Sequence, residues 1–255
     1  MPKYPRKYNL QQPIHTGHEI KFMVTRKESL PESFDLRKTD HVPAILDQGD
    51  IGSCVANAVS NSLKFCLNIN KLKWKPSRLY IYYFGRLYDG YSVTKDTGMS
   101  VTGGCASINK FGSCREKLWP YITSKFSIQP SRQSIVNAHK HDDNYKFLQI
   151  DQNIHDIKHA LLNGYPVICG IQVYSSFEDI ESMTTGKIPM PDTTKEQLYG
   201  GHAICLYSYD DKTKRFGVMN SWGTSVGNKG WFTIPYDYIT NTKLASDFNQ
   251  ITHYV

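Results

Sequence analysis

Apolar residues recur at helical spacing in three segments of the first two thirds of the chain. The first segment follows the turn-rich residues 48–52, with Ser53 or Gly52 as its expected cap and Cys54 in its first turn. Its apolar or small positions follow steps of three and four residues: Val55, Ala58, Val59, Ser62, Leu63 and Cys66. Two further helices are predicted over residues 100–111, ending at Gly112, and from Ile154 to Leu161, ending at Asn163 and Gly164.

The pattern changes after Pro166 to short runs rich in β-branched and aromatic residues, with Gly, Asp and Lys between them. These runs predict strands over residues 167–174, 203–209, 216–220 and 231–234. The first half of the chain therefore leans toward helices and the second half toward strands. With 255 residues, the chain is long enough for one sizeable core or for two half-sized lobes.

The composition is that of an ordinary globular protein, with 40% hydrophobic and 21% charged residues. No stretch reaches the roughly 18 apolar residues of a membrane span, so none is expected. The net charge is +7, and no nucleic-acid motif accompanies it, so no specific nucleic-acid partner is expected. We interpret the densest basic stretch around Trp74 as a solvated face: Lys71, Lys73, Lys75 and Arg78.

The six cysteines are too sparse for a disulfide scaffold and form no CxxC pair, so a zinc site is not predicted either. Cys66, Cys169 and Cys205 lie in apolar sequence, where a free thiol usually packs as a small buried hydrophobe. Cys54 differs from them, because a turn leads directly into its helix and should leave the helix start exposed. A thiol at a helix N-terminus faces the positive end of the helix dipole, which favours the reactive thiolate.

A proton acceptor for Cys54 has to come from elsewhere, and His202 is the best candidate among the nine histidines. Gly200 and Gly201 precede it and an apolar strand follows. If residues 202–220 form one antiparallel hairpin, its midpoint falls in the polar turn at Asp211, which places His202 opposite Asn220. The Asn220 side-chain oxygen would then fix the imidazole tautomer, and Trp222 would cover that hydrogen bond unless it is simply a core aromatic.

Three blocks of sequence resemble the signatures of the papain-like cysteine peptidase family: residues 48–54 (QGDIGSC), 201–203 (GHA) and 220–223 (NSWG). The similarity begins near Leu30 and runs to the end of the chain. It implies an α+β, two-lobe fold with a helical lobe over about residues 30–125, an antiparallel β-barrel-like lobe over about 126–255, and an active-site cleft between them. It also implies a Cys54, His202 and Asn220 triad, with Gln48 and the backbone N–H of Cys54 as donors to the oxyanion.

The chain departs from the family pattern at three positions near these blocks. Ile51 stands where relatives commonly have a cysteine, which removes the usual disulfide beside the nucleophile and agrees with a reducing compartment. Val55 replaces an aromatic residue, and Val226 replaces a second tryptophan. None of these departures changes the expected triad.

Substrate contacts are expected from the Gly201 and Trp222 blocks and from a Gly-containing element before or within the helix at 100–111. Gly98 is favoured over Gly103 and Gly104 for this role. His139 and His141, before two aspartates, would suit a metal or an exopeptidase-type cap, but we interpret them as a solvated loop. No cofactor or metal is predicted.

Residues 1–29 are polar, interrupted by proline and without a sustained period, so we interpret them as an extension of the peptidase domain at residues 30–255. One interpretation of the extension is a short propeptide or regulatory segment. Because it is much shorter than the helical inhibitory prosegments of relatives, a mobile tail is favoured over a segment lying in the cleft. No apolar stretch follows the basic start, so no conventional secretory signal is expected, and we expect an intracellular or virion-packaged protein.

The function predicted is a cysteine endopeptidase, most simply a monomer, that acts on polypeptide substrates. Two other functions use the same sequence features. One is a non-catalytic protein that keeps the fold for binding, which the intact Gln, Cys, His and Asn positions argue against. The other is Cys-dependent amidase or transferase chemistry on a non-peptide amide.

Overall fold

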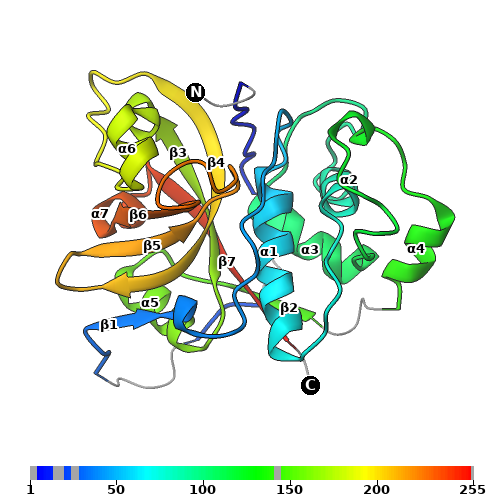
Figure 1. Cartoon of the computed structure of the whole chain (residues 1–255), viewed down its shortest axis with the longest axis horizontal. Helices are drawn as coiled ribbons and strands as arrows, with labels where there is room; N and C mark the ends of the chain where they lie inside the picture. The colour runs from blue at the N-terminus through cyan, green and yellow to red at the C-terminus, as the bar shows by residue number, and fades with distance from the viewer. Residues whose placement is uncertain (1–4, 14–19, 24–28, 141–144, 254–255) are drawn as a thin grey trace.

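The computed structural model describes residues 5–13, 20–23, 29–140 and 145–253. The chain forms a helical half and a sheet half that lie side by side, with helix α1 between them (Figure 1). The helical half contains α1 (Cys54–Ile69), α2 (Arg78–Tyr88), α3 (Val101–Phe111) and α4 (Arg132–Ala138). This is the α+β arrangement that the resemblance predicted.

The sheet half is built on one antiparallel sheet with the strand order β2-β7-β3-β4-β5-β6, and β1 pairs with β4 beside this path. The strands are β1 (Ser33–Asp35), β2 (Tyr145–Gln149), β3 (Val167–Tyr174), β4 (Leu198–Asp210), β5 (Arg215–Met219), β6 (Trp231–Pro235) and β7 (Ala245–His253). Three short helices belong to this half: α5 (Ile154–Leu162), α6 (Ile180–Thr185) and α7 (Tyr236–Thr240).

Helix α1 joins the two halves because it is buried along almost its whole length, as expected of a helix that packs on several sides. Two thiols connect α1 to the sheet. Cys66 Sγ in α1 donates to Ile251 O in β7 at 3.3 Å, and Cys205 Sγ in β4 donates to Ala58 O in α1 at 3.4 Å. Cys66, Cys169 and Cys205 are buried free thiols, which confirms the packing role predicted for them.

The helices expected near residues 54, 101 and 154 and the four expected strands are confirmed in type and place. Helix α2 was not predicted from the sequence, although most of its residues are buried. Strand β7 escaped prediction because buried polar residues break the apolar alternation: Asp247, Asn249 and Gln250.

The predicted register of the β4–β5 hairpin is wrong by two residues. Cys205 pairs with Met219, and continuing this register places Asn220 opposite Ile204 rather than opposite His202. The cause is a longer turn over residues 211–214, with Lys214 at a φ of 51°, and an irregularity in the ladder between Leu206 and Ser208. His202 still reaches Asn220, because residues two apart on a strand share one face of the sheet.

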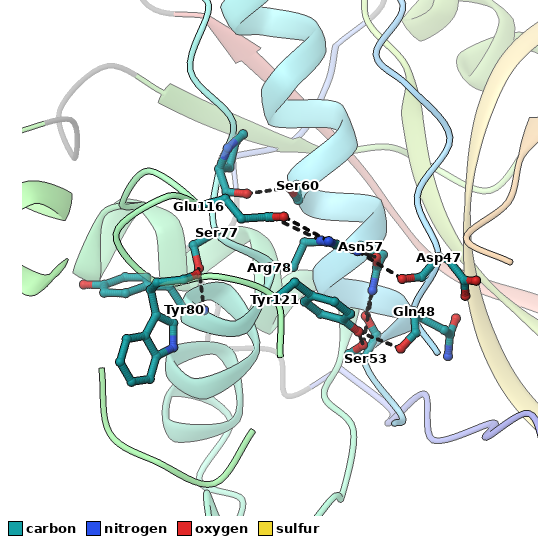
Figure 2. A network of polar contacts seen from close by, with 12 residues as sticks. Asp47, Gln48, Ser53, Asn57, Ser60, Ser77, Arg78, Tyr80, Glu116 and Tyr121 are labelled. Atoms are coloured by element: carbon teal, nitrogen blue, oxygen red, sulfur yellow. Dashed lines mark hydrogen bonds and ion pairs between the residues drawn. The ribbon is translucent and has the colours of Figure 1, made fainter. Parts of the chain in front are cut away.

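The basic stretch is only partly the solvated face that was predicted. Lys71, Lys73 and Lys75 are exposed, but the Arg78 side chain is 12% exposed and its guanidinium pairs with Glu116 at 2.9 Å. Arg78 begins α2 and points back toward the loop before α1 (Figure 2). Among the described residues, no helix is both long and apolar enough to cross a membrane.

The mobile tail expected at the N-terminus is wrong for residues 5–13. This segment passes between the two halves at the start of α1 (Figure 1). Leu10 N donates to Gly201 O on the sheet side at 3.0 Å, and Gln11 N donates to Met99 O on the helical side at 3.2 Å. Backbone hydrogen bonds on both sides give the segment a defined path.

Candidate active site

Cys54 is the first residue of α1 and lies where the helical half meets strand β4. Its side chain is fully buried, so the exposed helix start expected from the sequence is wrong for this structure. The extension also reaches this helix start: Asn9 packs on Gly52, two residues before Cys54, so closely that a Cβ on this glycine would lie 2.5 Å from Asn9 Nδ2.

His202 and Asn220 meet beside this helix start. His202 Nε2 lies 2.8 Å from Asn220 Oδ1, and both side chains are buried. The Trp222 ring stacks on the imidazole with a centroid distance of 4.9 Å and shields the pair from water. His202 Nδ1 has no hydrogen-bond partner among the described residues, so one ring nitrogen is held and the other is unoccupied.

Burial sets the protonation of both groups. It raises the pKa of Cys54 to about 11, although the backbone N–H groups of Ala203 and Val55 act in the opposite direction by favouring the thiolate. Burial also lowers the pKa of His202 to about 4, against the hydrogen bond to Asn220, which favours the charged form. The covered site therefore holds a neutral thiol and a neutral imidazole near pH 7. The Cys54 sulfur lies within hydrogen-bonding reach of the Ala203 backbone N–H, and Ala203 directly follows His202 in the sequence.

Gln48 lies in the turn before α1 and is also buried. Its side-chain Nε2 donates to Ile51 O at 3.2 Å, and its Oε1 accepts from Ser221 Oγ at 2.8 Å. Ser221 was not singled out by the sequence reasoning, although it stands inside the Asn220 block. Its N–H donates to Asn220 Oδ1 at 2.7 Å, so Ser221 connects Gln48 to the histidine pair.

The extension contacts the residues expected to bind substrate. Leu10 packs against Gly201, and Arg6 places its guanidinium 3.9 Å from the centroid of the Trp222 ring. Gly98 has a φ of 73° and lies so close to Asn9 that a Cβ would approach the Asn9 carbonyl oxygen to 1.6 Å. Gly98, Gly201 and Trp222 thus share one surface, and residues of the chain's own N-terminus lie on it.

The other glycine candidates lie elsewhere. Gly103 and Gly104 belong to α3, where Gly103 faces Asp89 and Gly104 faces Val55 in the core. His141 and the two aspartates after it lie outside the described residues, and His139 ends α4 in the helical half. Among the described residues, no cluster of His, Cys, Asp or Glu could hold a metal ion.

Two acidic residues that the sequence reasoning missed anchor the extension. Glu178 pairs with Arg6 at 2.8 Å and accepts a hydrogen bond from the Tyr8 hydroxyl. Asp96 pairs with Lys7 at 2.7 Å and accepts from Gly52 N at 3.0 Å. Neither has a local sequence signal, because each is distant in sequence from its partner in the extension.

The geometry agrees with comparisons to known proteins. The model of the papain family cysteine proteases matches residues 30–250. An uncharacterized peptidase C1-like protein of Acanthamoeba polyphaga mimivirus is 37% identical over 84% of this chain and 72% of its own length. A cathepsin B-like protein of Giardia intestinalis is 26% identical over 82% of this chain and 70% of its own.

Among solved structures, xylellain, a cysteine protease from Xylella fastidiosa, superposes with a TM-score of 0.90 at 33% identity and covers 98% of both chains. The fold and the family predicted from the three sequence blocks are therefore confirmed. The chain belongs to the papain family of cysteine proteases.

Proposed function

We propose that this protein is an endopeptidase in which Cys54 is the nucleophile, His202 transfers the proton and Asn220 orients the histidine. The observation that carries the proposal is the His202–Asn220 hydrogen bond of 2.8 Å, which leaves Nδ1 unpartnered next to the start of α1. An imidazole held at one nitrogen can take a proton with the other. Cys54 is the thiol at that helix start.

In the proposed reaction, the Cys54 sulfur attacks the peptide carbonyl while His202 accepts the thiol proton. The C–N bond then breaks, His202 returns the proton to the leaving amine, and water hydrolyses the thioester. The negative charge on the carbonyl oxygen is stabilised by the Cys54 N–H, since the first N–H groups of a helix lack partners within the helix. The Gln48 amide completes this site once its Nε2 leaves Ile51 O.

Covalent labelling tests the nucleophile. An epoxysuccinyl inhibitor at pH 5–7.5 is expected to modify Cys54 alone, as mapped by mass spectrometry, and Cys54→Ala should abolish the label. Cys66→Ala is the matched control, because Cys66 lies about three turns further along α1, where its Sγ donates to Ile251 O, and should not react. No label on either the folded full chain or the variant that begins at Leu30 would contradict the proposal. A panel of fluorogenic dipeptides separates proteolysis from amidase or transferase chemistry and from a purely binding role.

The second part of the proposal is that residues 5–13 restrain this activity. It is supported by the full burial of Cys54 and by the position of Asn9 and Leu10 against Gly98 and Gly201. Substrate and extension need the same surface, so only one of them can occupy it. The extension therefore acts as a short propeptide or regulatory segment.

The restraint is tested by comparing the full chain with a variant that begins at Leu30. The shortened protein is expected to label faster with the epoxysuccinyl inhibitor and to turn over peptides faster. Circular dichroism and thermal unfolding check that the shortened chain is folded. Equal rates for the two proteins would remove the restraint while leaving the peptidase assignment intact.

A further inference from the structure

The turn that carries Gln48 and leads to Cys54 has no regular secondary structure of its own. Residues 48–53 lie between an isolated bridge at Asp47 and the first turn of α1, and Gly49 has a φ of 65°. A loop of this kind depends on outside partners for its backbone polar groups. Those partners decide how accurately Gln48 and the Cys54 N–H face a reacting carbonyl.

Arg78, at the start of α2, is the centre of the contacts that hold this turn (Figure 2). Its Nη1 donates to Asp47 O at 3.0 Å and to Asn57 Oδ1 at 3.2 Å. Its guanidinium carbon lies 3.6 Å from the centroid of the Tyr121 ring, and Glu116 binds the other edge at 2.9 and 3.1 Å. The guanidinium is thus fixed on both edges and on one face.

A chain of hydrogen bonds runs from Arg78 to Gln48 with every donor used in one direction (Figure 2). Arg78 donates to Asn57, and Asn57 Nδ2 donates to Ser53 Oγ at 3.1 Å. The Ser53 hydroxyl lies 2.6 Å from the Tyr121 hydroxyl, which donates to Gln48 O at 2.7 Å. With the Tyr121 proton directed at Gln48, the Ser53 proton goes to Tyr121. Such chains polarise each bond in the same sense and strengthen it.

The same chain explains two features of Ser53. It is the N-cap of α1, yet its side chain makes no cap hydrogen bond, because its oxygen is used by Asn57 and Tyr121. Burial raises the pKa of Tyr121 to about 12, so its hydroxyl remains a donor throughout the working range of a peptidase.

We propose that Arg78 and Tyr121 are positioning residues for the peptidase reaction: together they fix the 47–53 turn so that the Gln48 amide and the Cys54 N–H meet the developing oxyanion. Neither residue touches the reacting atoms. The proposal rests on the proposed function, because it assigns Arg78 and Tyr121 to the machinery around Cys54. A displacement of catalytic groups by about 1 Å can cost about 100-fold in rate, and losing one oxyanion donor costs about 100- to 1,000-fold.

The test uses full-length protein, both unchanged and with Leu10→Asp to displace the extension. Tyr121→Phe keeps the ring beneath Arg78 and removes only the hydroxyl. Arg78→Met removes the guanidinium and its charge, and Arg78→Lys keeps the charge without the planar guanidinium. Active sites are counted with the epoxysuccinyl label, so that kcat refers to folded, competent protein.

The expected result is a fall in kcat per labelled site of about 10-fold for Tyr121→Phe and about 100-fold for Arg78→Met, with KM changed by less than about 3-fold. Arg78→Lys should recover little of the loss. Iodoacetamide alkylation of Cys54 needs no oxyanion site, so its rate should stay within about 2-fold of the parent.

A purely structural role predicts a different result. Fewer sites would then be labelled, but kcat per labelled site would be unchanged, and this outcome for both Tyr121→Phe and Arg78→Met would overturn the proposal. Failure of the peptidase assignment is distinguishable, because the parent protein and its Leu10→Asp form would then both show neither label nor turnover. If alkylation and kcat fall together by the same factor, the network acts on the thiol and the oxyanion role is wrong.

Discussion

Two stretches of chain meet at Gly52, close to Cys54, and they are held in very different ways. The 47–53 turn is fixed by hydrogen bonds from side chains that are mostly buried, and these include Asn57, Arg78 and Tyr121. The 5–13 segment is held by backbone bonds, by side-chain packing and hydrogen bonds, and by ion pairs, of which Lys7 with Asp96 is partly exposed. The first set of contacts suits a permanent part of the site, and the second suits a segment that can leave.

This contrast also explains the protonation of the site. A neutral thiol and a neutral imidazole result from burial, and the Tyr8 ring of the 5–13 segment lies against the His202 imidazole with a centroid distance of 6.0 Å. When the segment leaves, water reaches both groups and their charged forms become less costly. The 47–53 turn has its own hydrogen bonds and stays in place, so the proposed donors to the oxyanion do not have to be rebuilt.

The largest effect is expected at the group between the two stretches. His202→Ala removes the proposed proton carrier and should lower turnover by about 10⁴-fold or more, both in the full chain and when the 5–13 segment is displaced. Peptide hydrolysis per folded protein is the measurement. Substantial activity in a displaced His202→Ala variant would show that release of the segment, rather than the His202 imidazole, limits the reaction.

The next effect concerns the segment itself. Leu10→Asp places a charge against Gly170 and Gly201, where the leucine side chain now packs. Burying a leucine contributes about 1.5–3 kcal/mol and each 1.4 kcal/mol is a tenfold change, so turnover should rise by about 10- to 100-fold.

Gln12→Asp is the matched control for this change, since Gln12 is exposed in the same segment. A rise of similar size in the control would mean that charge alone, and not the loss of packing at Leu10, displaces the segment. No rise in either variant would contradict the weak attachment inferred for residues 5–13.

The sequence predicts the 47–53 turn and the start of α1 better than it predicts the 5–13 segment. Steps of three and four residues locate α1 and its first residue, and three short blocks locate the family. The meeting of His202 with Asn220 follows from the resemblance and not from strand register, which a long turn and a ladder irregularity shift by two residues. Arg78 was misassigned because its partners Glu116 and Tyr121 are far away along the chain. Residues 5–13 carry no periodic signal because backbone groups make several of their contacts.

A smaller effect is expected in the pH dependence of Cys54 alkylation. Burial disfavours the thiolate and raises the pKa of Cys54 to about 11, so in the full chain the alkylation rate should keep rising with pH beyond the ordinary thiol range. In the Leu10→Asp variant, solvation of the thiolate lowers the pKa, and the rise should occur at lower pH. Iodoacetamide rates between pH 5 and 10 give both profiles. Identical profiles would mean that Cys54 is buried by the two halves of the protein and not by the 5–13 segment.

The smallest effect separates the two ion pairs of the segment. The Lys7 side chain is 45% exposed, and such pairs contribute about 0–1 kcal/mol, so Lys7→Ala should raise turnover by less than about 5-fold. The Arg6 side chain is only 8% exposed and lies over Trp222, where a desolvated cation–π contact contributes about 2 kcal/mol. Arg6→Ala should therefore activate more strongly, by about 10-fold or more.

The comparison of Arg6→Ala with Lys7→Ala also shows which contact attaches the 5–13 segment more strongly. Arg6 acts at the tryptophan that covers His202, whereas Lys7 acts at the Asp96 carboxylate, which already binds Gly52 N on the other side of the site. Raising the salt concentration should reproduce the effect of Lys7→Ala, because salt screens exposed charges, and should leave most of the Arg6 effect in place. Equal activation by the two substitutions would mean that the segment is held by charge alone, and its attachment would then depend on ionic strength rather than on its fit to the histidine side of the site.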